Sequence, residues 1–126
     1  MHPALAVALG GAAGSLARFY MVVALKRIDA SFPWGTLLVN VAGSFLIGAT
    51  WAYCLARPAT PEWVRVGLMT GVLGGYTTLS SVSLETVLLV ESGAYWPAAA
   101  NVAANFGLGI LSCLAGLWLC RPLFAG

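Results

Sequence analysis

The sequence predicts an all-α integral membrane protein with four transmembrane helices, the third of them broken in mid-membrane. Of its 126 residues, 60% are hydrophobic and only 8% are charged, whereas a soluble domain carries about 25% charged residues. Such a chain has too few polar side chains to cover a surface that faces water. A bilayer core requires about 20 apolar residues per helix, and four segments meet that requirement. No linker divides them, so residues 1–126 are expected to form a single domain.

Each predicted span is bounded by residues that start or stop a helix. The spans are expected near Ala4–Leu25, Gly35–Leu55, Trp63–Val90 and Pro97–Leu119. Prolines lie at or near the predicted ends, at Pro33, Pro58, Pro61 and Pro97. Tryptophans gather near the same ends, as an aromatic belt at the membrane surface requires.

Small residues recur at a spacing of four in the predicted helices. Gly10 and Gly14 form such a pair in the first helix, and Ser44 and Gly48 form one in the second. These faces let helix backbones approach closely where lipid supplies no hydrophobic drive for association. They serve either packing within one subunit or an oligomer interface. We expect an oligomer, because four thin helices enclose little polar volume.

Basic residues are balanced across the membrane. With the N-terminus inside, the inner and outer sides carry equal numbers of them: Arg57, Arg65 and Arg121 against Arg18, Lys26 and Arg27. The positive-inside rule needs an excess of Lys and Arg on one side, and this chain has none. Both orientations can therefore insert, and chains of opposite orientation can pair. The net charge of +2 is too small and too scattered to indicate nucleic-acid binding.

The most unusual stretch is Gly71–Glu85, which places glycines, hydroxyls and a carboxylate inside an apolar segment. Irregular backbone at membrane depth is tolerated only where it is buried in protein or lines a water-filled cavity. Asn40 in the second span and Asn101 and Asn105 in the fourth add amides at the same depth. Each of these polar side chains, taken alone, commonly serves only as a hydrogen bond between membrane helices. Together they predict a track of neutral hydrogen-bond donors, which suits a small anion.

Two charged residues lie well inside the predicted spans, away from their ends. Arg18 is either an interfacial anchor or the cation of an electropositive vestibule. Glu85 is the only intramembrane carboxylate, and it either accepts hydrogen bonds from hydroxyls or carries protons. No nucleophile–base pair, metal cluster or phosphate loop appears, and the three cysteines show no metal or disulfide spacing. We therefore do not expect an enzyme.

Three motifs carry a resemblance to a known family. The first is a glycine-rich helix that ends in arginine, Gly10–Phe19 (GGAAGSLARF). The second is Gly35–Phe45 (GTLLVNVAGSF), and the third is Gly71–Thr78 (GVLGGYTT), which continues to Ser83–Glu85 (SLE). Through these motifs nearly the whole chain resembles the Fluc/CrcB fluoride channels, small four-helix bacterial membrane proteins.

The resemblance implies an antiparallel, dual-topology homodimer with two fluoride pores, a multi-pass protein of the bacterial inner membrane that exports cytoplasmic fluoride passively. It also implies a structural sodium ion at the dimer centre, bound by the backbone carbonyls of Gly74 and Thr77. Carbonyls of an unwound turn are free to hold such a cation.

The resemblance further implies an ion pathway that includes Asn40, Leu79, Ser81, Val82, Glu85 and Asn105, with Arg18 in the vestibule. The family pattern after the two threonines is Phe-Ser-Thr-Phe, whereas this chain has Leu79-Ser80-Ser81-Val82. Aromatic ring edges carry partial positive charge and can face an anion, which Leu and Val cannot do. We therefore expect slower conduction than in a relative that carries the phenylalanines.

Two alternatives to a homodimeric fluoride channel remain open. One is a proton-coupled exporter of the small multidrug type that uses Glu85. That reading requires a carboxylate in the first helix, which has none. The other is a non-conducting subunit that pairs with a phenylalanine-bearing paralogue in a heterodimer.

Overall fold

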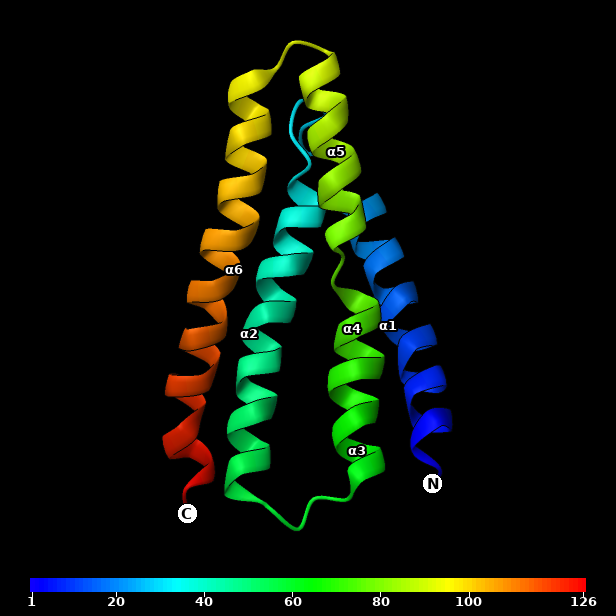
Figure 1. Cartoon of the computed structure of the whole chain (residues 1–126), viewed down its shortest axis with the longest axis vertical. Coiled ribbons are helices and arrows are strands. Elements are labelled where there is room, and N and C mark those ends of the chain that lie inside the picture. The colour runs from blue at the N-terminus through cyan, green and yellow to red at the C-terminus, as the bar shows by residue number, and fades with distance from the viewer.

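The computed structural model describes all 126 residues, which are helical almost throughout and form no strand. The elements are α1 (Pro3–Leu25), α2 (Trp34–Ala56), α3 (Glu62–Val66), the π-helix η1 (Gly67–Leu73), α4 (Gly74–Tyr76), α5 (Leu79–Glu91) and α6 (Tyr95–Phe124). Three of them, α1, α2 and α6, are long and apolar enough to cross a membrane. The pieces α3, η1, α4 and α5 follow one another along a fourth, broken path, and both termini lie at the same end (Figure 1). The four predicted helical passes, with the third broken, are confirmed.

Helix ends agree with the predicted ones to within one or two residues, except for α6. This helix runs to Phe124 rather than Leu119 and includes Pro97 in its first turn. Proline fits there because the first amides of a helix have no intrahelical acceptor. At 30 residues, α6 is about 45 Å long, so its ends extend beyond a hydrocarbon core of about 30 Å.

The helices pack as two close pairs. Helix α2 lies along α6, and α1 lies along η1 and α4 (Figure 1). Both contacts depend on glycine. A Cβ on Gly116 of α6 would lie 2.0 Å from the Phe45 carbonyl oxygen of α2, and a Cβ on Gly14 of α1 would lie 2.0 Å from the Val72 carbonyl oxygen. The small-residue pattern thus serves packing within one subunit, as small residues do between membrane helices.

The third path is irregular over a longer range than its break. Residues Gly67–Leu73 form a π-helix, and the chain stays helical as far as Tyr76. Single π-helical turns are rare and are frequently found at functional sites. The glycines of this stretch are therefore helical and do not form an unwound turn. The break itself is short and falls at Thr77 and Thr78.

Candidate functional site

The break consists of two threonines with extended backbone. Thr77 has φ −82° and ψ 157°, and Thr78 has φ −153° and ψ 119°. The Thr77 amide and hydroxyl both donate to the Leu73 carbonyl, which closes the end of α4. The Thr78 hydroxyl oxygen accepts from the Ser81 amide at 3.2 Å and caps the start of α5. Threonine suits both positions, because it is β-branched and carries a short hydroxyl.

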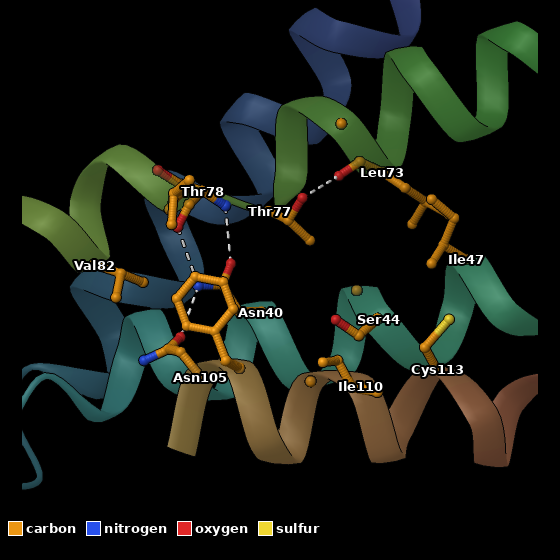
Figure 2. A pocket seen from close by; sticks show the side chains of 15 residues that line it. Asn40, Ser44, Ile47, Leu73, Thr77, Thr78, Val82, Asn105, Ile110 and Cys113 are labelled. Atoms are coloured by element: carbon orange, nitrogen blue, oxygen red, sulfur yellow. Dashed lines mark hydrogen bonds between the residues drawn. The ribbon is translucent and has the colours of Figure 1, made fainter. Parts of the chain in front are cut away.

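Asn40 of α2 holds both backbone groups of Thr78. Its Oδ1 accepts from the Thr78 amide at 2.8 Å, and its Nδ2 donates to the Thr78 carbonyl at 3.1 Å. The same Nδ2 donates to Oδ1 of Asn105 on α6 at 2.8 Å. Figure 2 shows these three side chains converging on the break. The amide of Asn40 thus replaces the helical partners that the peptide group of Thr78 lacks, as buried polar groups require.

An open cavity of about 380 Å³ lies beside this cluster (Figure 2). Its lining comes from α2, η1, α4, α5 and α6 and from the break. The lining includes the predicted site residues Asn40, Gly74, Thr77, Leu79, Val82 and Asn105. Ser44, one turn beyond Asn40 on α2, also lines it and makes no hydrogen bond within the chain. We call this the inner cavity.

A second open cavity, of about 500 Å³, lies on the α1 side of the break. Arg18, Ser81 and Glu85 line it, together with Lys26 and Thr36, and we call it the basic cavity. Thr78 belongs to the lining of both cavities. The break is therefore the wall at which the two hollows meet.

Arg18 is tied to the break as well as facing the basic cavity. Its Nη1 donates to the Thr77 carbonyl at 3.1 Å. Thr77 is thus held from α1 by Arg18, while Thr78 is held from α2 by Asn40. The guanidinium is half-buried and keeps donors that can meet an anion.

Glu85 is anchored to α2. Its Oε1 accepts from the Thr36 hydroxyl at 2.6 Å, while its Oε2 is buried with no hydrogen-bond partner in the chain. Lys26 lines the same cavity as this carboxyl group. The arrangement places one carboxyl group between a hydroxyl donor and two cations, because Arg18 also faces this hollow.

The two positions at which the chain departs from the phenylalanine pattern lie in different environments. Leu79 is 62% exposed, whereas Val82 is only 3% exposed. Leu79 therefore stands on the outer face of the chain beside the inner cavity. Val82 is buried in the chain, although it also lines the inner cavity.

The carbonyls expected to hold a cation are in different states. The Thr78 amide donates to Asn40 rather than to Gly74, so the Gly74 carbonyl lacks its helical partner. The Thr77 carbonyl already accepts from the guanidinium of Arg18. Gly74 thus fits a cation site as it stands. Thr77 fits only through its second lone pair, beside a positive charge that opposes a cation.

One site residue was not singled out from the sequence: Thr36, whose hydroxyl donates to Glu85. Thr78 and Asn101 were expected in the polar track, and the structure adds their roles. Thr78 lines both cavities, and Asn101 lies fully buried at 0% exposure and accepts from Asn105. The helical spacing of four between Thr36 and Asn40 places both on one helix face, and that spacing is the signal that could have identified Thr36.

Comparison with known proteins assigns this arrangement to a family. Residues 5–117 match the model described as "CrcB-like protein, Camphor Resistance (CrcB)". The chain is 44% identical over 124 residues to the fluoride-specific ion channel FluC of Rhizobium meliloti (strain 1021), which covers 98% of this chain and 99% of that one. It is 48% identical over 128 residues to FluC of Rhodospirillum centenum, which covers 99% of this chain and 100% of that one. It is 42% identical over 120 residues to FluC of Roseiflexus sp. (strain RS-1), which covers 94% of this chain and 97% of that one.

Proposed function

The chain belongs to the CrcB-like family, whose matched relatives are named fluoride-specific ion channels, and we propose that it is itself a fluoride-selective channel. It is a multi-pass membrane protein and not an enzyme. The proposed role is passive export of cytoplasmic fluoride across the bacterial inner membrane. The observation that carries the proposal is the pair of cavities, each with polar side chains in its lining, that meet at Thr78 in a largely apolar chain.

The chemistry of the two cavities supports an anion rather than a cation. Arg18 and Lys26 give the basic cavity positive charge, which raises the local concentration of anions. Beyond it the lining offers hydroxyls, which can replace part of the water shell of a dehydrating anion. Neutral donors bind an ion weakly enough to release it again, which conduction requires.

We further propose that two chains of opposite orientation form the channel. The inner cavity is open on the outer face of one chain, beside the exposed side chain of Leu79. Polar side chains and irregular backbone that face lipid are costly, so a second copy that covers this face is favoured. The equal numbers of basic residues on the two sides support opposite orientations. A heterodimer with a paralogue is the competing assembly.

A sodium ion at the dimer centre is part of the same proposal. The Gly74 carbonyls of two chains would supply hard oxygen ligands, and a cation there would hold the two broken spans together. The Thr77 carbonyls would join only through the lone pair that Arg18 does not use. Dimer stability in detergent should then increase with Na⁺ and not with equal concentrations of Cs⁺. Equal dimer stability in Na⁺ and Cs⁺ would rule out the proposed sodium site.

The proposed activity is tested with purified protein in liposomes loaded with potassium fluoride. Valinomycin supplies the compensating potassium leak, and an electrode follows fluoride in the external solution. Fluoride should leave protein-containing vesicles rapidly, and chloride should not. Efflux no faster than from protein-free vesicles would reject the homodimer as a channel. Recovery of efflux only after co-reconstitution with a paralogue would favour the heterodimer.

A further inference from the structure

The buried and partly buried amides near the break form one directed chain of hydrogen bonds. The Thr78 amide donates to Asn40 Oδ1 at 2.8 Å, and Asn40 Nδ2 donates to Asn105 Oδ1 at 2.8 Å. Asn105 Nδ2 donates to Asn101 Oδ1 at 3.0 Å and to the Asn101 carbonyl at 2.8 Å. Asn101 Nδ2 donates to the Thr86 hydroxyl at 3.0 Å, and this hydroxyl donates to a backbone carbonyl of α5. We call this series the amide relay.

The relay leaves no amide hydrogen for an ion. Both hydrogens of Asn40 Nδ2 have partners, the Thr78 carbonyl and Asn105 Oδ1. Asn105 Nδ2 has two acceptors on Asn101, and Asn105 is only 8% exposed. An anion could bind to these amides only if the bonds that hold the break were given up.

Hydroxyls in the same cavities have free hydrogens instead. The Ser81 hydroxyl accepts from the Thr78 hydroxyl at 3.1 Å, so its own hydrogen is available on the side of the basic cavity. The Ser44 hydroxyl makes no bond within the chain and lines the inner cavity (Figure 2).

We propose that Asn40, Asn105 and Asn101 are positioning residues of the fluoride channel, and that Ser81 and Ser44 donate to the ion. The inference rests on the proposed function. The relay fixes which way the amide of Asn40 points, because each amide is oriented by its next partner. That orientation pairs the Asn40 amide with both backbone groups of Thr78, the residue that separates the two cavities. Asn101 thus acts on the pathway from a position that no ion reaches.

The test uses Asn101→Leu, with Thr86→Val as a second variant that preserves side-chain shape. Each breaks the relay at the end away from the break. Hydrogen exchange of the Thr78 amide reports directly on its hydrogen bond to Asn40, and fluoride efflux reports conduction. A net hydrogen bond contributes about 1 kcal/mol, so we expect exchange to become roughly fivefold faster and efflux to fall by a similar factor. Ser112→Ala is the matched control, because it removes a different α6–α2 hydrogen bond, to the Val41 carbonyl.

Two further arms distinguish positioning from packing and from direct contact. In an Asn40→Leu background, Asn101→Leu should not accelerate Thr78 exchange further, because the relay is already cut. Ser44→Ala should lower efflux and leave Thr78 exchange unchanged. The Thr78 exchange measurements do not require conduction, so they test the relay even if the proposed function fails.

The contrary results are equally distinct. Wild-type Thr78 exchange in both Asn101→Leu and Thr86→Val would overturn the relay. Lost efflux with intact protection of the Thr78 amide would mean that Asn101 does not act through the Asn40–Thr78 hydrogen bonds. That result would also overturn the relay. If Asn101→Leu does not assemble, Thr86→Val alone decides.

Discussion

Replacing Gly14 with alanine should separate α1 from the broken span. A Cβ on Gly14 would lie 2.0 Å from the Val72 carbonyl oxygen and 2.9 Å from the Tyr76 amide nitrogen. Carbon and oxygen atoms in ordinary contact are about 3.5 Å apart, so the helices must move apart by roughly 1 Å or more. Neither contact is with a flexible side chain that can swing away. Overpacking of this kind costs about 1–3 kcal/mol.

Gly11 supplies the matched control on the same helix. A Cβ there has a single neighbour, the Gly71 carbonyl oxygen at 4.0 Å, which is an ordinary contact. Gly11→Ala should therefore leave the protein unchanged. Both variants change the same residue type by one methyl group, three positions apart.

The assay is thermal unfolding of the detergent-solubilised protein, paired with liposome efflux. A loss of 1–3 kcal/mol corresponds to a fall of roughly 5–10 °C in apparent unfolding temperature for Gly14→Ala. Efflux should fall about tenfold or more, because Arg18 of α1 holds the Thr77 carbonyl across this contact. Equal stability and efflux in Gly14→Ala and Gly11→Ala would show that α1 does not lie against Val72 and Tyr76, and would refute the packing described here.

Three further predictions concern conduction and assembly. Asn40→Leu should abolish fluoride efflux while the dimer still forms on a sizing column, because both backbone groups of the break lose their partner at a cost of several kcal/mol; wild-type efflux would show that Asn40 only joins helices. Leu79→Phe should raise efflux by placing a ring edge beside the inner cavity, whereas Val82→Phe, at a position 3% exposed, should lower the unfolding temperature. An unchanged efflux rate in a stable Leu79→Phe dimer would count against ring edges as anion ligands here. A single cysteine added at the C-terminus of a cysteine-free variant should react with impermeant reagents from both sides of the membrane, and labelling from one side only would rule out opposite orientations.

The helices themselves were predictable because lipid imposes a length and a composition on them. Three spans were located to within one or two residues by apolar length and flanking prolines. The extra turn at the end of α6 was not foreseen. Arg121 lies in the last turn, where a cation suits the negative end of the helix dipole, and Pro122 lies close enough to the helix end to be accommodated.

The position of the break was predicted only approximately. Glycine content pointed to Gly74 and its neighbours, because glycine loosens a helix in water. In this fold those glycines remain helical beside α1, where a Cβ on Gly75 would lie 2.7 Å from the Gly11 carbonyl oxygen. The chain opens at Thr77 and Thr78, where Arg18 and Asn40 from other spans take over the backbone groups. Such competition between distant residues is a tertiary effect, and it leaves no local pattern in the sequence.

The candidate site was predictable in membership but not in detail. Asn40 and Asn105 were expected to face one track, and they line one cavity. The helical period places each of them on the face of its own helix that points inward. Nothing in that spacing indicates that their donors are used within the chain. That depends on Asn101, whose buried amide is oriented by a hydroxyl on a different helix.

The central claim, a passive fluoride channel, is tested most directly by the reversal potential of the reconstituted protein. With a tenfold fluoride gradient the potential should settle near the value for a single monovalent ion, about 59 mV, and should be the same with and without a pH gradient across the membrane. A proton-coupled exporter that uses Glu85 would instead shift its reversal potential with the pH gradient. That shift, or a potential that follows chloride, would contradict the account.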